Sequence, residues 1–163
     1  MVTAWDVAAS VADPELPMVT LADLGILRAV EQDGQHVTVT ITPTYSGCPA
    51  MREISSDLRH QLRTAGYDDV TVRTALAPAW SSDWITDDGR RKLAQAGIAP
   101  PNPARTRAAG PIPLTLTAPS RTVACPRCGS SDTRETSTFS ATACKALYRC
   151  RSCDEPFEYV KEI

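Results

Sequence analysis

Four cysteines near the carboxyl end constrain the fold of this chain more than any other feature. They form two Cys-x-x-Cys pairs, Cys125 with Cys128 and Cys150 with Cys153. A tetrahedral Zn²⁺ needs four soft ligands, and two tight pairs on neighbouring hairpins supply two thiolates each. The spacing therefore predicts a zinc ribbon with one structural zinc per chain. A rubredoxin-like iron would use the same four thiolates, whereas a redox dithiol would leave one pair without a role.

The other two cysteines are Cys48 and Cys144. We interpret Cys144 first as a packing thiol; the alternatives are a substitute metal ligand and a transient metal relay with Cys48. Disulfides in a secreted domain are disfavoured, because the first residues show no basic region followed by an apolar run. No apolar stretch approaches the roughly 20 residues that a bilayer requires. We therefore expect a cytoplasmic protein with metal-binding cysteines and no membrane partner.

A change in composition divides the chain. Residues 99–120 contain six prolines, Pro100, Pro101, Pro103, Pro111, Pro113 and Pro119. Such a segment has little to bury and is extended and semi-rigid. A chain of 163 residues has room for one domain of about 100 residues and a smaller unit. The sequence thus predicts a first domain at 1–98, a Pro-rich linker at 99–120 and the zinc ribbon at 121–163.

Hydrophobic periodicity outlines the first domain. The pattern predicts helices at about 4–12, 51–62 and 86–96, and strands at 26–30, 36–42 and 70–73. Asp33-Gly34 is a hairpin signal between the first two strands. Gly66 and Gly97 are expected to close helices. This order favours an α+β fold, in which a small mixed β-sheet packs with helices on one face.

Cys48 lies where a predicted strand passes into a predicted helix. Pro49 suits the first helical position, which places Cys48 at the N-cap with its thiol near the positive end of the helix dipole. The hydroxyls of Thr44 and Ser46 are able to donate to a sulfur or an anion there. This arrangement favours a reactive thiolate, and the alternative is a buried, inert cysteine that only packs.

Charge argues against nucleic acid as a partner. The formal net charge is −2, and from Pro119 to Ile163 seven Lys or Arg stand against six Asp or Glu. That balance gives too weak a positive field for binding driven by phosphate contacts. A rigid ribbon is better suited to dock on another protein. Its aromatic residues are either anchors for that contact or its own core: Phe139, Tyr148, Phe157 and Tyr159.

The sequence offers no assembled catalytic set. We find no Ser-His-Asp combination, phosphate-binding glycine loop or paired-carboxylate site, and both histidines, His36 and His60, are interpreted as solvated. Trp80 and Trp84 are interpreted as partly buried core, with a partner surface as the alternative. Chemistry is therefore expected at Cys48 or at the four paired cysteines.

Several motifs together resemble a known family. The segments at 13–17, 23–25, 42–49 and 78–84 resemble the SufT-like domain of iron–sulfur assembly factors. With the two cysteine pairs and the run at 144–150, the whole chain resembles the PaaD family of bacterial phenylacetate degradation. One departure is Ser81-Ser82, where relatives often carry threonines; a hydroxyl is retained.

The resemblance implies an accessory or maturation factor of the phenylacetyl-CoA epoxidase system, without catalysis of its own. It implies that Cys48 is the reactive cysteine, with Asp13 and Glu15 in an acidic loop and a transient iron–sulfur cluster or iron as cargo. These two carboxylates have an alternative interpretation as turn-forming residues. A soft thiolate suits a cluster better than a di-iron carboxylate site, so we expect the iron–sulfur flavoprotein reductase of that system to be the partner.

Two other functions stay open at this point. The chain is either an accessory factor or a non-catalytic structural subunit or adaptor of the epoxidase complex. A thiol-dependent enzyme using Cys48 ranks third, because the motif contains no general base. The sequence leaves open whether the chain forms a homodimer.

Overall fold

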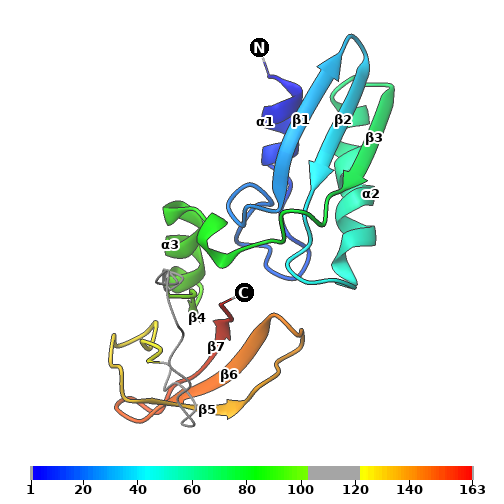
Figure 1. Cartoon of the computed structure of the whole chain (residues 1–163). Coiled ribbons are helices and arrows are strands. Elements are labelled where there is room, and N and C mark those ends of the chain that lie inside the picture. The colour runs from blue at the N-terminus through cyan, green and yellow to red at the C-terminus, as the bar shows by residue number, and fades with distance from the viewer. Residues whose placement is uncertain (1, 103–121, 163) are drawn as a thin grey trace, which may run out of the picture. The chain divides into compact units, whose positions relative to one another are not determined.

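The computed structural model describes residues 2–102 and 122–162. The chain divides into two compact units, the first ending at Ala96 and the second running from Gly97 to Glu162. Each unit has its own sheet (Figure 1). The α+β fold class that the sequence predicts is confirmed, with helices and a mixed sheet in the first unit and a ribbon of strands in the second.

The first unit is built on a three-stranded sheet. Strands β1 (Leu27–Asp33) and β2 (His36–Ile41) form an antiparallel hairpin, and β3 (Asp69–Thr74) runs parallel to β2. Gly34 turns the hairpin with a φ of +58°. Helix α2 (Ala50–Thr64) is the crossover between the parallel strands β2 and β3. The carboxyl ends of β2 and β3 therefore lie at the same end of the sheet.

Burial of one helix stripe against one sheet face holds this unit together. The fully buried side chains of β2 alternate along the strand and are Val37, Val39 and Ile41. Those of α2 repeat every four residues and are Ile54, Leu58 and Leu62. Helices α1 (Ala4–Ala9) and α2 lie behind the sheet in Figure 1. At the end of α2 the N–H of Tyr67 donates to Leu62 and that of Gly66 to Arg63. This is a Schellman cap, as Gly66 predicts.

Helix α1 is shorter than its sequence pattern predicts. A capping box between Thr3 and Asp6 begins it, but it ends at Ala9 and not near Ala12. The reason is tertiary: Val11 accepts a backbone hydrogen bond from Leu21, and the next residue forms an isolated bridge to Thr20. Backbone pairing thus takes the last predicted turn out of the helix.

The end of the first unit is a short 3₁₀ turn, η1 (Ser82–Trp84), followed by helix α3 (Asp87–Gln95). The Thr86 side chain caps α3 by accepting from the Gly89 N–H, and Gly97 follows its last turn with a φ of +79°. Trp80 is buried and its indole N–H donates to the Leu24 carbonyl over 2.9 Å, so it belongs to the core.

The second unit is a four-stranded sheet in the order β4-β7-β6-β5. The strands are β4 (Ile98–Ala99), β5 (Thr133–Ser137), β6 (Lys145–Cys150) and β7 (Pro156–Val160). Strand β4 pairs in parallel with β7. From the sequence, Ile98 was assigned to the end of the first domain and Ala99 to the start of the linker. Their pairing with β7 instead places both residues in the ribbon unit. Residues 103–120 of the linker proposed from the sequence lie outside the described residues.

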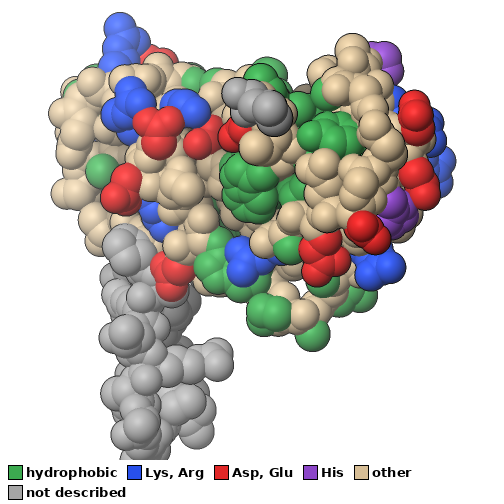
Figure 2. Space-filling model, turned by 90° about the horizontal axis from the view of Figure 1, so that it is seen from above, with side chains coloured by type: hydrophobic (Ala, Val, Ile, Leu, Met, Phe, Trp, Pro, Cys, Tyr) green, Lys and Arg blue, Asp and Glu red, His purple; other side chains and the backbone are tan. Residues whose placement is uncertain are grey.

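One face of the second sheet forms a small aromatic core. Tyr148 stacks on Phe157 at 5.9 Å and meets Tyr159 edge-on at 5.4 Å, between ring centroids. These three rings are buried, whereas Phe139 is exposed with the Lys161 ammonium 4.2 Å from its centroid. Within the described chain, no helix combines the length and the apolar character needed to cross a bilayer. Figure 2 shows acidic and basic side chains interspersed on the face that it presents.

Candidate metal centre and thiol loop

Two similar turns present the paired cysteines. In the first, the Gly129 N–H donates to the Cys125 carbonyl and Gly129 has a φ of +74°. In the second, Asp154 holds the corresponding position directly after Cys153, with a φ of +61°. Positive φ lets the chain fold back tightly, so that both sulfurs of a pair point to the same side. The hydroxyls of the two turns also meet, with Ser130 Oγ 2.7 Å from Ser152 Oγ.

The four sulfur atoms of these turns come together. The Sγ atoms of Cys125 and Cys153 are 3.8 Å apart, those of Cys128 and Cys150 are 3.6 Å apart, and all four lie within 4.8 Å of one another. A tetrahedral ion with metal–sulfur bonds of about 2.3 Å requires sulfurs roughly 3.8 Å apart. The four cysteines therefore fit a structural metal site of four thiolates.

The pKa values of two of these thiols are shifted in opposite directions. Burial tends to raise the pKa of Cys150, but hydrogen bonds from the N–H groups of Cys153 and Ser152 outweigh it and lower that pKa to about 7. A hydrogen bond from the Glu155 N–H opposes a rise at Cys153, but hydrogen bonding with Cys128 and burial raise its pKa to about 12. A bound divalent cation would allow all four thiols to ionise together, since each thiolate otherwise opposes the next.

Cys144 lies outside this group. It is half-buried, and its Sγ is 3.0 Å from the Thr142 hydroxyl. The four clustered sulfurs complete a tetrahedral set without it. The role of Cys144 stays a prediction.

The loop that carries Cys48 lies between β2 and α2. Cys48 is half-buried, Thr44 is half-buried and Ser46 is exposed. Pro49 is the N-cap of α2, with a φ of −66° and a ψ of −27°, so Cys48 precedes the cap by one residue and is not itself the cap. Pro49 already has helical dihedral angles, but the first helical residue is Ala50. No side chain caps this helix end.

The acidic loop uses its aspartate to shape a turn. Asp13 is buried, and its Oδ1 accepts hydrogen bonds of 2.9 Å from the N–H groups of Glu15 and Leu16. This is the turn-forming role that the sequence offers as the alternative for this carboxylate. Glu15 is half-buried on the same turn.

Backbone hydrogen bonds set these two loops at one end of the sheet. The Leu21 N–H donates to Val11, the Ile26 N–H donates to Leu21, and the Thr42 N–H donates to Ile26. The loop before β1 and the loop after β2 accordingly occupy the same end of the sheet (Figure 1). Asp13, Glu15, Thr44, Ser46 and Cys48 therefore share that end, where the carboxyl end of β2 meets the amino end of α2.

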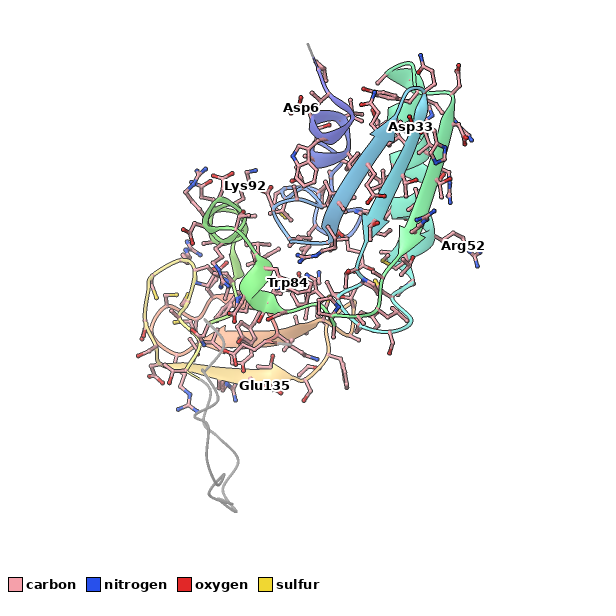
Figure 3. All side chains as sticks on the ribbon, turned by 45° about the horizontal axis from the view of Figure 1, so that its top comes forward. Asp6, Asp33, Arg52, Trp84, Lys92 and Glu135 are labelled. Atoms are coloured by element: carbon pink, nitrogen blue, oxygen red, sulfur yellow. The ribbon has the colours of Figure 1, made fainter. Side chains whose placement is uncertain are left out.

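The contacts that join α3 and the turn before it to the segment before β1 have no signal in the sequence. Lys92 of α3 pairs with Asp23 over 2.7 Å, and the Asp23 carbonyl accepts from the Thr86 N–H over 2.9 Å. The Arg28 guanidinium lies 3.7 Å from the ring centroid of Trp84. Figure 3 labels Lys92 on α3 and Trp84 on the preceding turn. The partners are far apart along the chain, so no local pattern marks them.

His36 is partly exposed to solvent, with 43% of its side chain accessible, but it also has two side-chain partners. Its Nδ1 lies 2.8 Å from Asp69 Oδ2 and its Nε2 lies 3.1 Å from Thr38 Oγ1. The register explains both contacts, because His36 is opposite Asp69 in the parallel ladder and two residues from Thr38 on the same face. The two-residue spacing was visible in the sequence and the partner strand was predicted, but the pairing of His36 with Asp69 was not.

Two family models match separate parts of the chain. Residues 4–74 match the family described as iron-sulfur cluster assembly protein, and residues 109–161 match the PaaD zinc beta ribbon domain. A solved domain of unknown function from Bacillus anthracis is similar in structure, with 28% sequence identity and a TM-score of 0.52 over 55% of this chain and 87% of that chain. The matches and the two structural units describe the same order along the chain.

Two relatives extend this similarity. An Fe-S protein maturation auxiliary factor of Porphyromonas gingivalis is 34% identical over 52% of this chain and 81% of its own length. A protein of Escherichia coli K12, provisionally named as one of the subunits of 1,2-phenylacetyl-CoA epoxidase, is 43% identical over 98% of this chain and 91% of its own length. Since that relative is matched along nearly its whole length and the ribbon matches the PaaD ribbon, the chain belongs to the PaaD family.

Proposed function

We propose that this protein is a non-catalytic accessory factor that assists assembly or delivery of an iron–sulfur cluster in a phenylacetyl-CoA epoxidase system. The observation that carries the proposal is Cys48, half-buried at the amino end of α2 in the part of the chain that matches an iron-sulfur cluster assembly family. The names of the two relatives, an epoxidase subunit and a maturation factor, support it.

The chemistry of the loop suits transient binding. A helix amino end favours negative charge, and the thiolate is the form of cysteine that binds soft metals. Thr44 and Ser46 add hydroxyls in the same loop. One thiolate, with only hydroxyl groups as neighbouring weak ligands, binds a cluster edge or an iron without a full ligand set. The bound cluster or iron is therefore released readily. Asp13 contributes by fixing the adjacent turn.

The most suitable client is the iron–sulfur flavoprotein reductase of the system. Its cluster takes sulfur ligands, whereas a di-iron site takes carboxylate and imidazole. The ribbon serves this function as a docking unit, stapled by a structural Zn²⁺ on Cys125, Cys128, Cys150 and Cys153. The name of the Escherichia coli relative favours a second candidate, a structural subunit or adaptor of the epoxidase.

A deletion strain complemented with variants tests the function. With wild-type protein or the control Cys144→Ser, the reductase should be purified with both flavin and cluster. With Cys48→Ser, it should retain flavin but lose most of its cluster absorbance, while the oxygenase still takes up iron in vitro.

The adaptor hypothesis makes the opposite forecast. It requires this chain to copurify with the oxygenase in stoichiometric amounts and the reductase cluster to be complete in the deletion strain. A complete reductase cluster in the Cys48→Ser strain would contradict the proposed role of this thiol.

A further inference from the structure

An open cavity of about 290 Å³, called the arginine groove below, lies on the ribbon unit. Its lining is Arg134, Arg149, Cys150, Arg151 and Asp154. Cationic side chains outnumber the single carboxylate by three to one. The volume is larger than one small oxyanion needs and lies near the lower limit, about 300 Å³, of pockets that hold small molecules.

The strand register gathers the three guanidinium groups. Arg134 on β5 is directly opposite Arg149 on β6, so the two side chains leave the sheet on the same face. Arg151 follows Arg149 by two residues, just past the end of β6. The opposite face carries the aromatic core around the buried Tyr148. Like charges directly opposite each other destabilise a sheet, so this arrangement is unfavourable unless an anion compensates it.

Carboxylates of the described residues compensate these arginines only in part. Arg149 pairs with Asp154 at 3.3 Å and Arg151 with Asp132 at 3.8 Å, with all four side chains substantially exposed. Arg134 has no ion pair within the described chain. The carboxylate next to it, Glu135, instead accepts hydrogen bonds from the hydroxyls of Tyr148 and Thr138.

A fourth arginine, Arg127, lies within the first cysteine turn and is not part of the lining of the groove. It pairs with Glu155, which follows the second turn. The Glu155 carboxylate is therefore engaged by Arg127 and not by an arginine of the groove.

We propose that this groove binds the phosphate group of a small organic phosphate. Guanidinium groups hold phosphate oxygens through paired hydrogen bonds, and a phosphate offers up to two charges and three terminal oxygens to several arginines at once. A single carboxylate, such as that of Asp154 or Asp132, satisfies one arginine and is displaceable. The inference goes beyond the proposed function, because the groove and Cys48 belong to different units.

Titration of the zinc-loaded full-length protein with ADP tests the site. NMR signals of the Arg134 and Arg149 side-chain Nε–H groups should shift with ADP, and more weakly with inorganic phosphate, but not with adenosine. Arg134→Gln and Arg149→Gln should each weaken ADP binding at least fivefold in calorimetry. The matched control is Arg52→Gln, since this exposed arginine projects away from α2 in the other unit (Figure 3).

Three outcomes would overturn the proposal. In the first, a hexaglutamate peptide shifts the arginine signals while ADP does not, which would make the groove a dock for an acidic protein surface. In the second, Arg52→Gln weakens ADP binding as much as the groove variants do. In the third, none of the phosphates binds. Unchanged zinc content and unchanged Tyr148 signals in each variant exclude misfolding as the cause.

Discussion

Two glycines of the first unit show how the same backbone angle has different consequences. Gly25 and Gly34 both have positive φ, at +67° and +58°. A Cβ at Gly34 would meet nothing within 4 Å. A Cβ at Gly25 would lie 2.5 Å from the Trp84 Cβ and 2.7 Å from its carbonyl oxygen. Gly25 is therefore required both by its φ and by the close approach of η1.

Alanine substitution should separate these two effects. We expect Gly34→Ala to lower the free energy of unfolding by about 1 kcal/mol, from backbone strain alone. Gly25→Ala should lower it by about 3 kcal/mol or more, because overpacking adds to the same strain. Urea unfolding followed by tryptophan fluorescence measures both. Equal losses in the two variants would contradict the close packing of Trp84 on this turn.

Among the elements, α3 is fixed to the turn before β1 by charge as well as by packing. Burial opposes ionisation of Asp23, but the Lys92 ammonium and the N–H of Thr20 outweigh it and hold the pKa of Asp23 below its ordinary value. The same contact, with a second one from Asp88, raises the pKa of Lys92. A carboxyl with a lowered folded pKa contributes stability above about pH 4 and loses it as the pH falls through that folded pKa.

The pH dependence of Asp23→Asn should reveal this contribution. Near neutral pH the variant should unfold with about 2 kcal/mol less free energy than wild type, the scale of a hydrogen bond to a charged group. The difference should shrink as the pH falls through the lowered pKa of Asp23, because the protonated carboxyl no longer attracts the Lys92 ammonium. Urea unfolding at pH 7, 5 and 3 measures it, with Asp33→Asn on the exposed end of β1 as control. A difference that is constant with pH would mean that the ion pair adds nothing.

At the scale of the whole molecule, the two units are stabilised differently. The first has a core of helix and sheet side chains. Among its described residues, the second has one core cluster of eight buried residues, two of which, Cys125 and Cys150, belong to the four clustered cysteines. We expect so small a core to depend on a bound metal, since metal binding and folding are coupled.

Metal removal should therefore unfold one unit only. Strong chelator, or Cys128→Ser, should abolish the NMR dispersion of Tyr148 and Tyr159 while the tryptophan fluorescence stays native. All three tryptophans, Trp5, Trp80 and Trp84, lie in the first unit, which makes the two readouts independent. Purified protein should contain close to one zinc per chain by elemental analysis, and Cys144→Ser should retain it. A ribbon that stays folded without metal would refute this coupling.

Local chemistry along the chain determined much of this structure. The stripe of Ile54, Leu58 and Leu62 predicts α2, and Gly66 predicts its cap, because helix periodicity and capping act over a few residues. The paired cysteines likewise predict the four-sulfur cluster, since each tight turn fixes two sulfurs. The position of Cys48 is wrong by one residue, because Pro49 is compatible with both the cap and the first helical turn.

Only the tertiary structure decided the contacts between distant segments. Strand β4 belongs to the ribbon because it pairs with β7. Asp23 forms an ion pair with Lys92, which lies 69 positions further along the chain. Strand β6 was not predicted, although Ala146, Tyr148 and Cys150 alternate as buried residues along it. Arg134 meets Arg149 only because β5 and β6 pair in that register. Such contacts depend on which segments share a core, and no short stretch of sequence records its distant partner.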